Sequence, residues 1–218
     1  MDFDTVWHDR RGGFTRKIKE SLAPKRNLKQ RINSATRILD KQNKRLEIAI
    51  RSLKEKDKRY FARVVEAIKN HDRTRATIYA NELVEIRKAL RVLNSAKYAI
   101  ESVMVRLSTV EDLGDAVAEI MPIMQVLKNV KGNLSLILPT AEDGINKVSE
   151  LLQDIMWDAT ASGAEPIDIS VANDEALKIL QEAEKKAKEE MEKELPGIPT
   201  EVHEKSGEDS SVFSEFKF

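Results

Sequence analysis

A stretch of 89 residues, numbers 25–113, contains neither glycine nor proline. Turn-rich folds need both residue types at short intervals, whereas the interior of a helix tolerates neither. Apolar residues in the stretch follow alternating steps of three and four, which is the spacing of heptad a and d positions. The first such stripe comprises Leu28, Ile32, Ala35, Leu39, Leu46, Ala49, Leu53 and Tyr60, with the polar Gln42 and Lys56 at the two positions between them that complete the spacing. We therefore expect long amphipathic helices rather than strands.

Two apolar stripes separated by a polar segment predict a helical hairpin. The second stripe runs from Tyr79 to Leu107, and the segment between the stripes contains Asn70, which can end a helix, and Asp72, which can cap one. The pattern predicts one arm over about 27–70 and a returning arm over about 73–120. The alternative is one continuous helix, because the turn lacks glycine and proline. The hairpin is favoured because a lone helix leaves its apolar stripe without a partner.

The second half of the chain contains shorter segments. Pro122, Gly132 and Pro139 are expected to divide it into short helices over 123–130 and 142–161. The predicted fold is all-α: a long antiparallel helical hairpin followed by short helices, an acidic C-terminal helix and a disordered tail. The predicted division is an N-terminal basic and aromatic segment (1–24), the hairpin core (25–121), short helices (122–163), and a linker, acidic helix and tail (164–218).

The formal net charge of the chain is zero, but the charge is unevenly distributed. Residues 1–106 carry 27 Lys and Arg against 13 Asp and Glu, and residues 107–218 carry 10 against 24. A helix with such an excess of cations can bind an anionic membrane surface, a nucleic acid or an acidic protein segment. Residues 174–194, with eight carboxylates and five lysines, are a candidate acidic partner within the chain. The basic surface is predicted to include Arg10, Arg11, Arg16, Lys17, Lys25, Arg26, Lys29, Arg37, Lys44 and Arg45.

The residue types that catalysis and metal binding require are absent or scattered. There is no cysteine, the three histidines are far apart in the sequence, and no glycine-rich phosphate loop is present. We therefore predict no catalytic residue, no metal site, no cofactor and no enzymatic activity. No apolar run approaches the length of about 18 residues that a membrane-spanning helix needs, so membrane contact is expected to be peripheral.

The start of the chain has the composition of a membrane-contact segment. Phe3, Trp7 and Phe14 are interleaved with arginine and lysine. Large apolar groups beside basic ones suit the headgroup boundary of a membrane, so these three residues are candidates for insertion. The alternative is that they pack against the end of the hairpin.

A second candidate contact motif follows the acidic helix. Leu195, Pro196, Ile198 and Pro199 form an apolar-proline pattern in a tail that is expected to be disordered. Proline restricts the unbound chain, so such a segment binds extended in a groove at a small entropic cost. The alternative is a plain spacer after a helix.

The order of these elements resembles the ESCRT-III (Snf7-type) family of membrane-remodelling filament proteins. The local match lies in Ala76–Lys88, whose Ala-Asn-Glu-Leu-Val-Glu-Ile-Arg-Lys is similar to the family's Ala-Lys-Asp/Glu-Leu-Val-x-x-Arg-Lys core. Asn81 stands where that family usually has lysine. Within the family, the chain is most similar to archaeal ESCRT-III cell-division proteins without a winged-helix tail, and the resemblance covers roughly residues 15–200.

The resemblance implies a filament-forming protein that remodels or severs membranes in cell division and has no enzymatic activity of its own. It implies polymerisation with itself and with paralogous ESCRT-III subunits, in the cytoplasm at the inner face of the membrane, at the division site. In a closed subunit the acidic helix would cover the basic hairpin, and its release would allow polymerisation. The alternatives are a helical nucleic-acid-binding protein, which the tail motif does not favour, and a plain coiled-coil scaffold.

The resemblance also assigns a partner to the tail motif. By this resemblance, Leu195, Pro196, Ile198 and Pro199 bind the microtubule-interacting-and-transport (MIT) domain of a Vps4-like AAA ATPase, which would disassemble the filament. Family members have a proline or an acidic residue elsewhere in the motif, and Gly197 in the middle of this one is smaller and looser.

Overall fold

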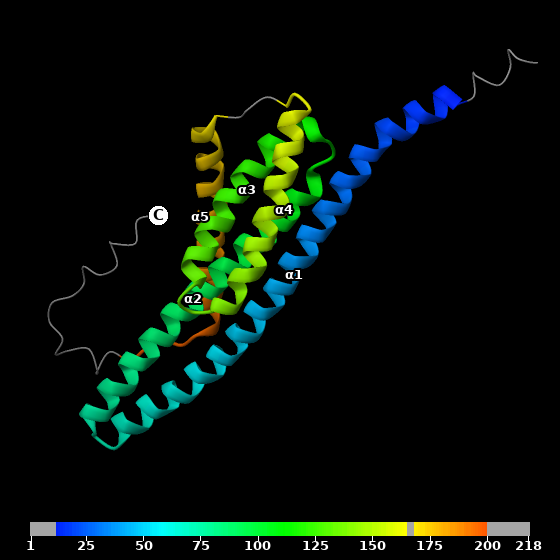
Figure 1. Ribbon diagram of the computed structural model, residues 1–218. Helices are drawn as coiled ribbons and strands as arrows, with labels where there is room; N and C mark the ends of the chain where they lie inside the picture. Colours follow the sequence, from blue (N-terminus) through cyan, green and yellow to red (C-terminus); the bar gives the residue numbers. More distant parts are fainter. Residues whose placement is uncertain (1–11, 165–167, 200–218) are drawn as a thin grey trace, which may run out of the picture.

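Two long antiparallel helices form the frame of the molecule in this computed structural model (Figure 1). They are α1 (Gly12–Lys69) and α2 (Arg73–Thr109). Three further helices follow, α3 (Leu113–Leu134), α4 (Glu142–Ala161) and α5 (Ile169–Glu194), with a short 3-10 helix, η1 (Pro139–Ala141), before α4. The structure describes residues 12–164 and 168–199, with side chains from Leu28 onward except that of Asp115. These residues contain no strand, so the predicted all-α fold with a long helical hairpin is confirmed.

The hairpin turn ends one helix and caps the next. His71 adopts a left-handed conformation (φ 55°), and the N–H groups of His71 and Asp72 donate to the carbonyls of Ile68 and Ala67. Asp72 then caps α2, because its side chain accepts a hydrogen bond from the N–H of Arg75 at 3.0 Å. The predicted capping role of Asp72 is confirmed, and the left-handed position falls one residue after Asn70.

The predicted apolar stripes form the interface between the two arms. Leu39 and Leu46 of α1, and Leu83 and Leu90 of α2, are fully buried. The arms also share a buried ion pair, in which Arg87 Nε of α2 donates to Asp57 Oδ1 of α1 at 2.8 Å. The side chain of Asp57 is 2% exposed and that of Arg87 is 16% exposed, so neither charge has much water to solvate it.

The second arm is shorter than the sequence predicts. α2 ends at Thr109, the buried Val110 is extended (φ −71°, ψ 109°), and α3 begins at Leu113. The apolar stripe changes phase at Val110, so an unbroken helix would turn the following apolar residues away from the core. Breaking the helix lets α3 turn and bury them against α2, α4 and α5.

The predicted divisions at Pro122 and Gly132 are wrong, because α3 runs through both residues. Pro122 is buried in the core. A proline inside a helix removes one backbone hydrogen bond, and the packing of α3 on three neighbouring helices outweighs that loss. α1 also starts earlier than the predicted start at about residue 27, because it begins at Gly12 and includes Pro24.

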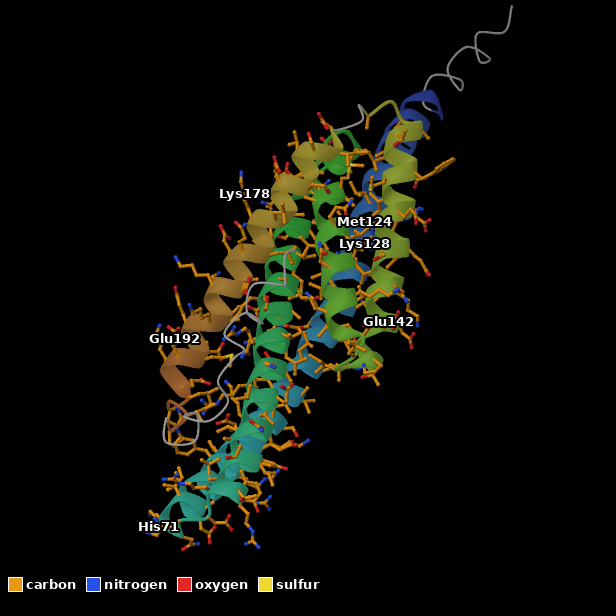
Figure 2. The ribbon with its side chains drawn as sticks, turned by 90° about the vertical axis from the view of Figure 1, so that its left-hand side faces the viewer. His71, Met124, Lys128, Glu142, Lys178 and Glu192 are labelled. Carbon is orange, nitrogen blue, oxygen red and sulfur yellow. The ribbon has the colours of Figure 1, made fainter. Side chains whose placement is uncertain are left out.

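The last two helices lie on either side of α3. α4 packs against α1 and α3, whereas α5 packs against α2 and α3 (Figure 2). The approach of α4 to α1 is close at Gly144, where a Cβ atom would lie 2.0 Å from Nε2 of the buried Gln42. Glycine is therefore the residue that this helix crossing accommodates.

Candidate protein-binding and membrane-binding surfaces

The predicted basic surface lies along α1. Lys29, Arg37, Lys44 and Arg45 are exposed on this helix. Lys44 pairs with Asp40 at 2.6 Å, and Arg45 Nη1 donates to the carbonyl of Thr140 in η1 at 2.9 Å. Arg45 therefore also has a structural contact. Sequence reasoning did not single out further exposed cations of α1, which are Lys41, Arg51, Lys56, Lys58, Arg59, Arg63 and Lys69.

The remaining predicted membrane residues belong to the first part of the chain. Arg16, Lys17, Lys25, Arg26 and Phe14 are in the part of α1 whose side chains are outside the described set. Figure 1 shows that this end of α1 extends past the rest of the bundle. Arg10, Arg11, Phe3 and Trp7 lie outside the described residues. Their roles at a membrane stay predictions.

α5 is attached to the bundle mainly through small side chains. Its buried residues are Ala172, Ala176, Ile179, Leu180, Ala183 and Ala187. A fully buried Ile or Leu stabilises a fold by about 1.5–3 kcal/mol, whereas an alanine buries only one methyl group. The alanines let α5 approach closely but bury little apolar surface. Polar contacts therefore matter more for holding α5 than for holding the two arms of the hairpin together.

The position of α5 differs from the expected cover of the basic arm 27–70. The helix lies mainly along α2 and α3, where Glu175 pairs with Arg106 of α2 at 3.1 Å. Among the described residues, Lys54 alone of the α1 cations forms an ion pair with α5. Burial of the apolar face of α5 therefore decides where this helix lies. Attraction between opposite charges joins α5 to α1 only at the C-terminal end of α5.

Four polar residues from three helices meet at the end of α5, and we call them the three-helix junction. Tyr98 of α2 donates a hydrogen bond to Glu190 of α5 at 2.5 Å. Lys54 of α1 pairs with Glu190 at 3.1 Å and with Glu194, one helical turn later, at 2.5 Å. The side chains of Lys54 and Glu190 are 25% and 23% exposed, so water screens this pair less than it screens a surface pair.

The junction shifts the pKa values of three of its groups. The hydrogen bond to Glu190, together with burial, raises the pKa of Tyr98 to about 12. Burial acts to raise the pKa of Glu190, but hydrogen bonds from Tyr98 and Lys54 outweigh burial and lower that pKa. Burial also acts to lower the pKa of Lys54, but hydrogen bonds to Glu194 and Glu190 leave it raised. Each shift favours the protonation states that the contacts require.

The predicted proline motif begins where α5 ends. The N–H of Leu195 donates to the carbonyl of Met191 at 2.9 Å, and the half-buried Leu195 side chain packs against the core. Pro196 is exposed, while Ile198 and Pro199 are half-buried. Leu195 and Pro196 line a groove of about 480 Å³. The other lining residues are Arg51, Lys54, Glu55, Asp57, Lys58 and Phe61 of α1, and Glu194 of α5.

Sequence reasoning missed the junction because its members look ordinary. Lys54 is one of many cations in a basic arm, and Glu190 is one of eight carboxylates in an acidic segment. Among these residues, only Tyr98 could have indicated a polar contact from the sequence. It stands next to the apolar stripe of the second arm, and a tyrosine at a helix interface brings a hydroxyl group that needs a partner.

Neither a metal site nor a membrane-spanning helix is present in the residues that the structure describes. Within 12–164 and 168–199, no group of three or more His, Asp and Glu side chains is placed to hold a metal ion. Over the same residues, no helix combines the length and the apolar composition that crossing a bilayer requires.

Comparison with known proteins identifies relatives along most of the chain. Cell division protein B1 of Sulfolobus acidocaldarius is 35% identical over 199 residues, which cover 91% of this chain and 90% of that protein. Cell division protein B of the same organism is 31% identical over 173 residues, 79% of this chain and 66% of that protein. No family model matches the chain. No solved structure matches it either. Because the similarity to protein B1 spans nearly the full length of both chains, this chain belongs to the cell division protein B family.

Proposed function

We propose that the protein is a filament-forming subunit of the archaeal ESCRT-III type that remodels the membrane during cell division. The names of its relatives support the role in division. The observation that carries the filament proposal is the hairpin of α1 and α2 with α5 folded back on α2 and α3. Release of α5 would uncover apolar residues of α2 and α3, and a neighbouring subunit could then bury them.

The weak attachment of α5 supports a subunit with two states. Ile179 and Leu180 are the only large aliphatic side chains among its buried residues in the described chain. Elements with few buried apolar contacts open at a lower free energy than the core of the same protein. α5 is therefore the helix that a neighbouring subunit can displace most easily.

The exposed face of α1 supports a peripheral position on an anionic membrane, at the division site. Its cations include Arg37 and Lys41, and Ile48 stands among them with 66% of its surface exposed. A cation near an anionic bilayer contributes about 1 kcal/mol, and many subunits in a filament add such contacts through avidity. Phe3, Trp7 and Phe14 are the proposed inserting residues at the start of the chain.

Sedimentation with lipid vesicles, combined with electron microscopy, tests the proposal. We expect the full chain to form polymers on anionic vesicles and not on neutral ones. A chain that ends at Gly163 should polymerise more readily, because it lacks α5. Absence of polymers from both chains on both kinds of vesicle would contradict the proposed function.

Matched charge reversals test whether α1 is the membrane face. The double variant R37E/K41E should lose binding to anionic vesicles. The control K147E/K178E makes the same change in charge at exposed positions of α4 and α5, and it should bind like the original chain. Equal losses of vesicle binding in the two double variants would mean that the net charge of the chain, and not the exposed face of α1, controls binding. Strong, salt-dependent binding to DNA with none to lipid would instead indicate a nucleic-acid-binding protein.

The tail motif is proposed to recruit the MIT domain of a Vps4-like ATPase. Calorimetry with that domain should lose its signal for Ile198→Asp and keep it for Ile198→Val, which preserves the apolar anchor. Leu195→Asp should also abolish binding, but Leu195 packs against the core, so Ile198 gives the cleaner test. Polymer formation by I198D should be unchanged. Unaltered affinity of I198D would remove the motif from the proposal.

A further inference from the structure

A tryptophan is exposed on the side of α4 that faces away from the core. Trp157 has 78% of its surface exposed. It belongs to a row of exposed residues at alternating steps of four and three, which we call the outer face of α4: Asp143, Lys147, Glu150, Asp154, Trp157 and Ala161. Tryptophan is enriched among the residues that contribute most to binding at protein interfaces. The outer face therefore has the composition of a contact surface.

The charges beside Trp157 indicate the class of partner. Glu150 and Asp154 lie two turns and one turn before it, and neither forms an ion pair within the described chain. Two uncompensated carboxylates repel an anionic membrane surface, so insertion of Trp157 into such a membrane is not expected. The same carboxylates attract a cationic surface, and the tryptophan needs an apolar group on that surface.

α1 offers such a surface, but only to another copy of the chain. Its outward residues at steps of four and three form the basic stripe of α1: Arg37, Lys41, Lys44, Ile48, Arg51, Glu55 and Lys58. Ile48, the apolar member, is 66% exposed. Within one subunit, Asp158 next to Trp157 pairs with Arg31, so Ile48 is about 25 Å further along α1. The two surfaces therefore meet only between copies.

The spacing of the residues selects a parallel alignment of the two helices. Glu150 and Trp157 are seven residues apart, and so are Lys41 and Ile48. When the helices run parallel and Trp157 packs on Ile48, Glu150 lies opposite Lys41. An antiparallel alignment with the same Trp–Ile contact would bring Glu150 to Glu55, which repels it.

The fold lets a two-fold axis form this contact twice. α4 runs antiparallel to α1 in one subunit (Figure 1), because Arg31 pairs with Asp158 whereas Arg45, later in α1, contacts Thr140, earlier in the chain. A two-fold axis across the helices reverses the second copy, so α4 of each copy runs parallel to α1 of the other. Lys41 lies one turn from Arg45, so the basic stripe and α4 share one side of the molecule.

We propose that two copies of the chain, folded as in this structure, form a symmetric dimer through the outer face of α4 and the basic stripe of α1. Trp157 of each copy packs on Ile48 of the other, and Glu150 pairs with Lys41. The contact needs neither release of α5 nor a membrane. The dimer therefore does not rest on the proposed function.

Sedimentation equilibrium of the full chain without lipid tests the dimer. We expect a monomer–dimer equilibrium that E150K/D154K weakens at least about tenfold, because a symmetric interface contains each substitution twice. The control E182K/E189K makes the same change in charge at two exposed positions of α5, and it should dimerise like the original chain. A monomeric original chain, or equal weakening by both double variants, would overturn the proposal.

Exchange of the charges gives a sharper test. K41E/K44E alone should weaken the dimer, whereas its combination with E150K/D154K exchanges the signs and should restore the dimer. Trp157→Ala should weaken dimerisation by about tenfold or more, and Trp157→Phe should keep most of it. Failure of the combined variant to recover would overturn the proposed pairing.

Disulfide formation tests the alignment, because the chain has no cysteine of its own. The parallel alignment places Asp154 opposite Lys44 of the other copy, so D154C/K44C should link two copies. Within one subunit these residues are about 14 Å apart along the helix axes, too far for a disulfide. D154C/R51C represents the antiparallel alignment and should stay unlinked. Linkage of D154C/R51C in place of D154C/K44C would overturn the alignment.

One consequence of the dimer does rest on the proposed function. Lys41 belongs to the proposed membrane face, so the dimer would hide part of that face and anionic lipid would compete with the second copy. Vesicle sedimentation of Trp157→Ala, which favours the monomer, should therefore show tighter binding than the original chain. If this variant is monomeric and binds vesicles no more tightly, the dimer stands and the competition with lipid is overturned.

Discussion

The hydroxyl oxygen of Tyr98 lies 2.5 Å from a carboxylate oxygen of Glu190, so the second arm of the hairpin is tied directly to the last turns of α5. Lys54 of the first arm completes this contact from a third helix. At the junction, α5 therefore contacts both arms of the hairpin. Its groups are ionisable, so pH changes its strength.

The first prediction concerns the pH dependence of this junction. The pKa of Glu190 is lowered from 4.5, so its stabilising contribution is present above about pH 4.5 and is lost as pH falls further. The pKa of Tyr98 is raised from 10.0 to about 12, so its contribution is present below pH 10 and is lost between the two values. The raised pKa of Lys54 acts in the same direction above 10.5.

The measurement is the difference in thermal midpoint between the original chain and Tyr98→Phe. It should be constant from about pH 6 to pH 9, and it should shrink below about pH 4.5 and above about pH 10. Lys97, Glu101 and Glu194 are the other charged groups that act electrostatically on Tyr98 and Glu190. A midpoint difference that varies strongly between pH 6 and pH 9 would contradict the assignment.

The hairpin could be predicted from the sequence because its signal is local and repeated. Leu39, Leu46 and their heptad neighbours repeat the apolar spacing of a helix many times. Asp72 is a residue type that commonly caps the start of a helix, so it marks the turn. The helix boundary predicted at Pro122 is wrong because the low helix propensity of proline describes an isolated helix. The packing of α3 on three neighbouring helices overrides that propensity.

The position of α5 could not be predicted from charge. Its net negative charge pointed to the basic arm, whereas its alanine seam fits the surface of α2 and α3. A seam of small residues is visible in the sequence, but the surface that matches it arises only after α2 breaks at Val110 and α3 folds back. The roles predicted for the motif and the basic surface concern partners, and a single chain contains no partner to test them.

The second prediction concerns the buried ion pair. Asp57→Asn should lower the free energy of unfolding by about 3 kcal/mol, because it leaves the guanidinium of Arg87 buried without its counter-charge. Denaturant unfolding of Glu85→Gln is the control, since Glu85 is in an exposed pair with Lys88 and should matter by less than about 0.5 kcal/mol. The double variant D57L/R87M should recover most of the loss. A cost for D57N as small as that for E85Q would refute the burial argument.

The third prediction concerns the hairpin turn. His71 is the non-glycine residue with a positive φ in the described chain, at 55°. Left-handed backbone costs an L-residue about 1 kcal/mol, whereas glycine adopts it freely, so His71→Gly should raise the stability by about 0.5–1 kcal/mol. Asn70→Gly, one residue earlier, should not stabilise the protein. Thermal unfolding of both variants distinguishes relief of strain from a general tolerance of this turn for glycine.

The final prediction uses two glycines that lie in helices with opposite surroundings. Gly132 of α3 has nothing within 4 Å of where a Cβ would stand, so Gly132→Ala should stabilise the protein by about 0.5–1 kcal/mol through helix propensity. At Gly144 of α4 the new Cβ would lie 2.0 Å from Gln42 Nε2. Gln42 is only 3% exposed and cannot move aside freely, so Gly144→Ala should destabilise by about 1–2 kcal/mol despite the same gain in propensity.

A double-mutant cycle tests whether the cost at Gly144 arises from Gln42. Truncation of that side chain frees the space, so G144A in the Q42A background should cost much less than in the original chain, with a coupling energy of about 1 kcal/mol or more. Denaturant midpoints of the four proteins give this number. If G144A is instead as stabilising as G132A, then α4 does not approach α1 as closely as described. If the two substitutions are additive, the cost of G144A comes from elsewhere in the α1–α4 interface.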